Sequence, residues 1–539
     1  MLDKITSEWR SKMFGKKTEI EKKIISFITN DALKGFMEGR FSYLSLIFEA
    51  FTINDAIECH KEVAKKFCEF LSKISVKNLI KLSDNCRSNF YFYENAAYQY
   101  EIVSYKVEWK NFKFERNQFK YLSDEEYVSV LRLGTFHSNG FFRQMCMECL
   151  SEYKDNLPFY ILRINDWVQT IRPLAYELAE KEIKDDDVQV IFSALPMIEK
   201  VKNSGRREHE YIDEILVLTE KVILEKISNC SLYSIVNCEI MIKNIIYRYL
   251  CKYNILVLEQ MRQLLNMEKT GYGKGLIFEA LLNNYDLSIN EIDEYLLSKN
   301  SIVRFKALEY KYKKLKKSWP GLELMLLDKS RRIRDNVRFM LSRDDSFDIL
   351  DYYMNQLKVN NNPVVILGIG ECGSSKDIEV ILPYLNSDND IIIKKTLKAY
   401  GMLVAYNGSD MYWKYLFNDS DLVSNEAYRL IRKYNVHYGG KQLFETYKKY
   451  CNSKIADRLV ILLLSEGIWS NMKYLLMLYD DENLSDNIIS LIRMKISIRN
   501  KYFVSLSLKQ KEEIIKVLQN KHSLPQKLVK EILFDLKHI

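Results

Sequence analysis

The chain has 539 residues and a formal net charge of +8, with 47% hydrophobic and 28% charged residues. The hydrophobic fraction is ample for a continuous core, while no apolar run approaches the roughly 18 residues that a membrane span needs. We therefore expect no membrane insertion, and residues 1–12 contain no apolar segment of the signal-peptide type. The 10 cysteines are scattered without a disulfide framework, which favours the reducing cytoplasm as the compartment.

Residues that interrupt regular structure are scarce: the chain has 7 prolines, 18 glycines and no Ser/Gly-rich linker. A chain of this length would ordinarily divide into several domains. The lack of linkers favours instead one continuous superhelix of stacked helices.

The segment 1–130 differs from the rest, and we expect it to form an atypical N-terminal cap region. Residues 20–82 are typical of helices, whereas the segment 89–121 is crowded with aromatic side chains. In part of that segment, from Val103 to Trp109, apolar and polar residues alternate. A period of two predicts a strand or a small β-hairpin near 100–121, inserted in an otherwise helical chain.

Lysine residues interleave with the aromatic residues of the segment 89–121. Stacking aromatic rings beside cations is a common way to hold single-stranded nucleic acid. A packed amphipathic hairpin that closes the N-terminal end of the repeat array explains the same alternation, and we favour that interpretation.

From residue 131 to 539 the sequence is typical of helical repeats. A helix-start signature recurs at a nearly constant interval on either side of a gap between 172 and 243, with these residues at its reference position: Arg143, Arg172, Lys243, Lys274, Arg304, Arg334, Pro363, Ile393 and Ser424. Three and six residues later the side chains are small or apolar in every repeat, except at Thr396. These offsets fall on one helix face. A period near thirty predicts stacked helical hairpins, each of which buries its apolar face against its neighbours.

Short polar residues stand six positions before the reference position in most repeats. They are Asp166, Asn237, Ser298, Asp328, Ser387 and Asn418. Such side chains can accept hydrogen bonds from the free N–H groups of a first helical turn, so we expect them to be helix N-caps. His137, Glu268 and Leu357 occupy the same position and do not fit this role.

Two stretches, 327–337 (Leu-Asp-Lys-Ser-Arg-Arg-Ile-Arg-Asp-Asn-Val) and 157–173, resemble HEAT repeats, particularly the short bacterial kind found in relatives of phycobilisome lyases. The resemblance implies an all-α fold, an α-α superhelix, and is clearest over 131–440. In HEAT repeats the Asp and the Arg of this motif commonly form an ion-pair ladder between repeats. The resemblance thus implies structural roles for Asp166, Arg172, Arg304, Asp328 and Arg334, with the ladder interrupted where Pro363 and Ile393 replace the arginine.

The positive charge is concentrated in one segment. Thirteen basic and four acidic residues lie between Arg304 and Arg343, an excess that alone exceeds the net charge of the chain. Such a cluster attracts phosphate backbones, or an acidic protein or membrane surface. The candidate residues for binding an anion, a nucleic acid or a partner are Lys311, Lys313, Lys314, Lys316, Lys317, Arg331, Arg332 and Arg338. Charge runs are usually solvated faces, and phosphate contact has no motif-level signature, so we favour a solvated or protein-binding face over a nucleic-acid site.

Catalytic and metal-binding motifs are weak in this sequence. Cys146 and Cys149 have a zinc-like spacing, but both fall in the apolar repeat positions and no second Cys/His pair follows. The glycines of 271–275 lack the spacing of a phosphate-binding loop. We therefore predict no catalytic residue, no metal site and no cofactor.

The sequence leaves several functions open. The first hypothesis is a non-enzymatic scaffold that binds an unidentified partner protein or an extended peptide on its repeat surface. The second is nucleic-acid binding, because one branch of HEAT-like proteins comprises DNA glycosylases with a basic groove. The third is a chaperone-like lyase that presents a chromophore, which rests on the repeat resemblance alone.

Overall fold

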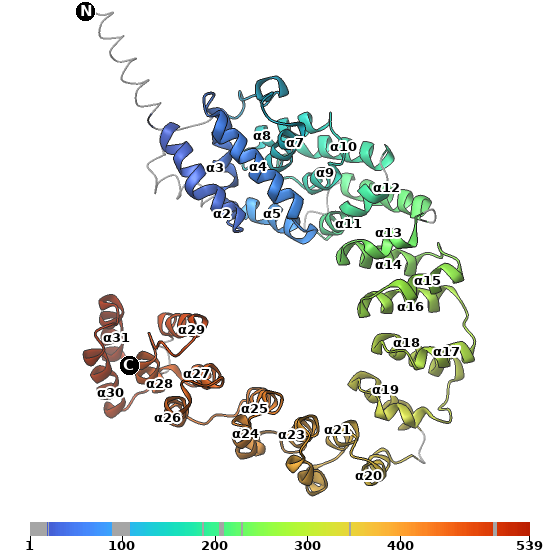
Figure 1. Ribbon diagram of the computed structural model, residues 1–539, viewed down its shortest axis with the longest axis vertical. Coiled ribbons are helices and arrows are strands. Elements are labelled where there is room, and N and C mark those ends of the chain that lie inside the picture. Colours follow the sequence, from blue (N-terminus) through green and yellow to red (C-terminus); the bar gives the residue numbers. More distant parts are fainter. Residues whose placement is uncertain are drawn as a thin grey trace, which may run out of the picture. The chain divides into compact units, whose positions relative to one another are not determined.

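A computed structural model describes residues 19, 21–88, 108–185, 188–203, 210–227, 230–343, 347–499 and 504–539, and within these ranges the chain forms helices and turns without a strand (Figure 1). The all-α helical-repeat fold predicted from the sequence is confirmed. The chain forms two compact units, residues 1–311 and 312–539. Residue 130, where we expected the cap region to end, lies in α7 (Asp124–Gly134), inside the first unit.

The first unit begins with short helical segments around an aromatic core. They are η1 (Ile28–Ala32), α2 (Leu33–Met37), η2 (Phe41–Tyr43), α3 (Leu44–Ile47), η3 (Phe48–Thr52), α4 (Ile57–Lys73) and α5 (Val76–Ser88). The rings of Phe36 and Phe48 each lie 5.5 Å from the ring of Phe67 on α4, and all three are fully buried. Because α4 also packs on α7, this core joins the N-terminal helices directly to the first repeat.

The predicted β-hairpin near 100–121 is wrong for residues 108–121, which form turns and the 3-10 helix η4 (Arg116–Phe119); residues 89–107 lie outside the described residues. The backbone of Phe114 finds its partners in helix side chains instead of a second strand. Its N–H donates to Met145 Sδ at 3.3 Å, and its carbonyl accepts from the Tyr127 hydroxyl at 2.5 Å. The Phe114 ring is fully buried and stacks on Phe119, so its burial in the helical core, not a sheet, explains the apolar pattern.

The rest of the first unit is a series of helical hairpins. Their helices are α7 with α8 (Gly140–Leu150), α9 (Leu157–Ile164) with α10 (Ile171–Asp185), α11 (Val188–Lys202) with α12 (Glu210–Ile227), α13 (Leu232–Asn237) with α14 (Ile240–Lys252), α15 (Leu258–Met267) with α16 (Gly271–Asn284), and α17 (Ile289–Leu296) with α18 (Ser301–Leu315). First helices pack on first helices, as α9 does on α11, and second on second, as α14 does on α16. In these pairs one hairpin is covered by the next.

The second unit continues the pattern, with 3-10 turns in place of some first helices. Its elements are η5 (Leu322–Leu327), α19 (Arg331–Leu341), α20 (Ile349–Val359), α21 (Pro363–Cys372), η6 (Ser375–Asp377), α22 (Ile378–Ile381), η7 (Leu382–Asn386), α23 (Asp390–Val404), η8 (Ala405–Gly408), α24 (Ser409–Leu416), α25 (Asp421–Lys433), α26 (Gly440–Tyr450), α27 (Ala456–Ser465), α28 (Ile468–Met477), α29 (Asp486–Ser497), α30 (Leu508–Asn520) and α31 (Gln526–His538). The second helices α21, α23 and α25 form one row (Figure 1). A Cβ at Gly370 would lie 2.6 Å from the Ala399 Cα, so this glycine allows α21 and α23 to pack closely.

The expected N-caps are wrong by two residues. The caps stand four positions before the reference residue, as with Asn139, Thr270 and Asn389, whose side chains accept from N–H groups of the first turn. The residues six positions before close a turn ahead of the cap: the Asp328 carboxylate accepts from the Ser330 N–H at 2.7 Å. Polar residues occupy both positions, and spacing alone does not tell them apart.

The repeat register is also displaced in one place. Helix α21 begins at Pro363 and is capped by Asn362, so Ile366 and not Pro363 is equivalent to Arg334. Proline is favoured at the first position of a helix, where its missing N–H would have no partner. The regular spacing therefore fails here, because the interval from the start of α19 at Arg331 to the start of α21 is longer than the interval from α21 to the start of α23 at Asp390.

Candidate interaction surface

Where the reference residue is Arg143, Arg304 or Arg334, its side chain holds the loop that precedes its helix. Arg143, Arg304 and Arg334 each lie in the first turns of a second helix and donate from Nη1 to the carbonyl six residues earlier, at 2.8, 2.7 and 2.7 Å. A guanidinium satisfies carbonyl groups in a loop that has no regular structure of its own. An arginine at the reference position therefore fixes the geometry of the connection in these three hairpins.

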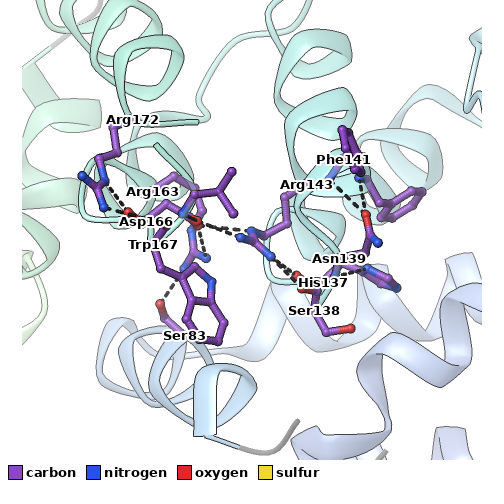
Figure 2. A network of polar contacts seen from close by, with 12 residues as sticks. Ser83, His137, Ser138, Asn139, Phe141, Arg143, Arg163, Asp166, Trp167 and Arg172 are labelled. Carbon is purple, nitrogen blue, oxygen red and sulfur yellow. Dashed lines mark hydrogen bonds and ion pairs between the residues drawn. The ribbon is translucent and has the colours of Figure 1, made fainter. Parts of the chain in front are cut away.

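A buried network joins the first repeats (Figure 2). Arg143 binds the fully buried Asp166 through two contacts, Nη2–Oδ1 at 2.7 Å and Nε–Oδ2 at 3.1 Å. Arg163 approaches the same carboxylate at 3.2 Å and donates to Ser83 Oγ at 2.7 Å. Arg172 contacts the carbonyl of Asp166 instead of its carboxylate. Burial disfavours ionisation of Asp166, but Arg163 and Arg143 outweigh it and hold its pKa below the ordinary value.

An equivalent ion pair links two later hairpins of the first unit. Lys243 Nζ lies 3.0 Å from Glu268 Oε1, and Tyr247 donates to Glu268 Oε2 at 2.5 Å. Burial opposes ionisation, but the hydrogen bonds from Tyr247, Thr270 and Lys243 lower the pKa of Glu268 to about 2. Glu268 does not fit the N-cap role that its position in the repeat predicted. The sequence signal that could have revealed its role is its position, six residues before the reference residue of its repeat, which is also the position of Asp166.

In the second unit Arg334 pairs with a residue that sequence reasoning missed. Glu371 on α21 has a fully buried side chain and accepts from Arg334 at 3.0 and 2.5 Å and from Arg338 at 2.7 Å. Burial raises the pKa of Glu371, but the hydrogen bonds from the two arginines lower it further than burial raises it. No repeat position marked Glu371, because it lies near the end of α21, beyond the offsets that the repeat pattern defines.

Several of the predicted basic residues already have carboxylate partners. Lys311 is buried and pairs with Asp293, and Arg338 pairs with Glu371 and Asp335. Arg331 lies 3.5 Å from Asp335 and 3.8 Å from Glu371. Asp293 and Glu371 lie outside the segment 304–343, so the charge of that segment overstates its charge at the surface.

The other candidates are exposed to solvent. Lys313 and Lys314 lie in the last turn of α18, Lys316 and Lys317 in the loop after it, and Arg332 in the first turn of α19. The structure thus gathers Arg331, Arg334 and Arg338 around Glu371, and leaves the exposed lysines on the surface.

A recurring apolar residue is exposed at the second position of the second helices. In the first unit it is 55% exposed at Phe141, 38% at Met241 and 57% at Tyr272, and in the second unit 52% at Ile391 and 46% at Leu422. The first turn of a helix ordinarily favours acidic residues, because they complement the helix dipole. We call these five residues the apolar ridge, without implying that its parts in the two units adjoin.

The ridge has gaps and one extension. Ile302 and Val364 hold the same position but are half-buried, and Arg332 replaces the apolar residue in α19. The loop before α10 adds the exposed side chains of Trp167 and Val168. Since α14 and α16 pack side by side, Met241 and Tyr272 stand on neighbouring helices whose axes lie about 8–10 Å apart.

An open pocket of about 460 Å³ lies near the end of the chain, lined by Ser497, Arg499, Lys530, Glu531, Phe534 and Asp535. Its arginine is already bound, because Arg499 Nε lies 2.7 Å from the Asp535 carboxylate. Across the described ranges, no group of three or more His, Cys, Asp or Glu residues is arranged to hold a metal ion, and no helix is long and apolar enough to cross a membrane.

Comparison with known proteins found neither a family nor a curated protein that matches this chain.

Proposed function

We propose that this chain is a non-enzymatic cytoplasmic scaffold of HEAT-like repeats that binds a partner protein on its repeat surface. The HEAT-like assignment is supported by the hairpin stacking and by the ion pairs Arg143–Asp166 and Lys243–Glu268, which occupy one repeat position. These ion pairs resemble the ladder between HEAT repeats.

The apolar ridge is the observation that supports a protein partner. Large apolar side chains recur at one register position where the helix dipole and solvent both favour acidic residues. Exposed apolar groups that recur in this way mark interaction sites more often than isolated ones do. These side chains are 38–57% exposed, so burying the exposed part of one in an interface would contribute about half of the 1.5–3 kcal/mol that full burial gives.

Site-specific photo-crosslinking tests this proposal. A photoreactive amino acid replaces Tyr272 in the full chain, and a matched variant carries it at Asn283, an exposed position near the other end of the same helix. We expect a discrete protein adduct from Tyr272 that survives nuclease treatment and is absent from Asn283. Equal adducts at both positions, or adducts lost on nuclease treatment, would contradict a protein-binding ridge.

Nucleic-acid binding remains the second candidate because of the exposed lysines. Lys313, Lys316 and Lys317 are exposed and form no ion pair with any described residue. A titration of binding to non-specific DNA against salt tests this candidate, since phosphate contacts weaken steeply with salt. Reversing the charge at Lys313, Lys314, Lys316 and Lys317 should abolish such binding. An absence of affinity at low salt would remove this candidate.

A further inference from the structure

Two lysines on α23 have no counterion among the described residues. Lys395 and Lys398 are half-buried on the second helix of a hairpin in the second unit. Neither ammonium group forms an ion pair or a hydrogen bond with a residue that the structure describes. A partly desolvated charge without a partner is unfavourable, yet this helix carries two of them one turn apart.

The carboxylates closest to these lysines are already engaged. Helix α23 packs between α21 and α25 in one row (Figure 1). On α21, Glu371 is held by Arg334 and Arg338. On α25, Glu426 is 5% exposed and accepts from Arg429 at 3.1 Å.

The local electrostatics agree with an excess of positive charge. Burial lowers the pKa of Lys395, and the neighbouring cations Lys394 and Arg334 lower it further. Burial also lowers the pKa of Lys398, although Glu426 acts in the opposite direction. An added anion would relieve both effects.

The two lysines lie in line with the apolar ridge. Ile391, Lys395 and Lys398 are spaced i, i+4 and i+7, so they share one face of α23. Leu422, Glu426 and Arg429 have the same spacing on the neighbouring α25. On α23 the exposed apolar residue and Lys398 are separated by about 10 Å along the axis, at 1.5 Å per residue.

We infer that the face of α23 formed by Ile391, Lys395 and Lys398 binds an acidic segment of the partner protein, whose carboxylates pair with the two lysines. This inference rests on the proposed scaffold function and specifies the chemistry of its partner. An extended segment that places an acidic residue about three positions from an apolar one matches the spacing on α23, at roughly 3.3 Å per residue.

The exposed Ile391 favours a polypeptide over a nucleic acid. Glu371 and Glu426 border the lysines on both sides, but arginines already pair with both of them. Ile391 is 52% exposed and lies on the same face of α23 as the two lysines. A polypeptide can bring both a carboxylate and an apolar side chain to this face, whereas a phosphate backbone brings only the anion.

Binding of a labelled deca-glutamate peptide to the full chain tests this inference, with a ten-nucleotide oligothymidylate as the competing polyanion. At low salt, about 50 mM, we expect deca-glutamate to bind more tightly than the oligonucleotide. Replacing both lysines, Lys395→Gln with Lys398→Gln, should weaken peptide binding about tenfold or more. The matched pair Lys313→Gln with Lys317→Gln should change it less than about twofold.

A charge-preserving double variant, Lys395→Arg with Lys398→Arg, distinguishes loss of charge from misfolding. It should retain binding of the peptide. Equal losses in the two glutamine pairs, tighter binding of the oligonucleotide, or no binding of deca-glutamate would each overturn the inference. The scaffold proposal is tested separately by crosslinking at Tyr272, in the other unit. An adduct at Tyr272 without peptide binding would contradict only the inference of an acidic segment. Peptide binding without an adduct would contradict only the proposal that the apolar ridge binds a protein.

Discussion

The charges around Asp166 and those on α23 form a direct contrast within one repeat architecture. At the first site, Arg143 and Arg163 are 2% exposed, and both contact a fully buried carboxylate. On α23, Lys395 and Lys398 are half-buried and lack a carboxylate partner among the described residues. The contrast shows that the chain itself neutralises the buried cations between hairpins, whereas the two lysines of α23 have no counterion among the described residues; our inference assigns that role to a partner.

The largest expected effect comes from breaking the buried site. Asp166→Ala leaves Arg143 and Arg163 buried without compensation, which should cost about 3–5 kcal/mol. Hydrogen exchange of the backbone amides in α8 and α10 measures this loss of stability, as a fall in the free energy of opening of the two helices. Asp421→Ala is the control, since Asp421 pairs with Lys454 at the surface and should cost less than about 1 kcal/mol. Equal effects of the two substitutions would contradict a structural role for Asp166.

A pH titration tests the second buried ion pair. The folded-state pKa of Glu268, about 2, lies below its ordinary value of 4.5. The ionised group therefore stabilises the fold above pH 4.5, and this contribution is lost as the pH falls toward 2. The loss should approach about 3 kcal/mol for the α14 and α16 amides. In Glu268→Gln this part of the pH dependence should be missing, and an unchanged profile would show that Glu268 is not its source.

The smallest expected effect comes from α23. Lys395→Gln with Lys398→Gln removes mutually repelling cations, so stability should stay within about 1 kcal/mol of the wild type or rise. Lys243→Gln is the matched comparison, because it removes the partner of the buried Glu268 and should cost about 3 kcal/mol. Thermal unfolding of the three proteins checks the order. A marked destabilisation by the double substitution on α23 would show that Lys395 and Lys398 stabilise the fold and are not reserved for binding.

The stacking of the hairpins could be predicted from the sequence, because it depends on apolar residues at fixed offsets. Every residue three positions after the reference position is fully buried, with Ile366 taken as the reference residue of α21: Cys146, Ala175, Ile246, Ile277, Ala307, Val337, Ile369, Thr396 and Ala427. Even Thr396, which broke the apolar pattern, is accommodated by a hydrogen bond from its hydroxyl to the Ile392 carbonyl at 2.9 Å.

The ion pairs and the candidate site could be predicted only in part. Glu268 occupies the position of Asp166, so a search for any carboxylate there would have found it. Glu371 and the lysines of α23 could not be found in this way, since their roles depend on which helices pack together. The charge count over 304–343 also misled, because Lys311 and Arg338 are paired with residues beyond that segment.

The reactivity of individual lysines with acetic anhydride, read by mass spectrometry on the folded wild-type chain, compares the two kinds of cation most directly. Lys243 should be protected in the free protein, because it is 6% exposed and bound to Glu268. Lys395 and Lys398 should react readily and become protected only when deca-glutamate is added, while exposed Lys313 remains unaffected. Labelling of Lys243 as fast as that of Lys395, or no protection of Lys395 and Lys398 by the peptide, would contradict the account. Lysines paired within the chain and lysines that await a partner would then not differ.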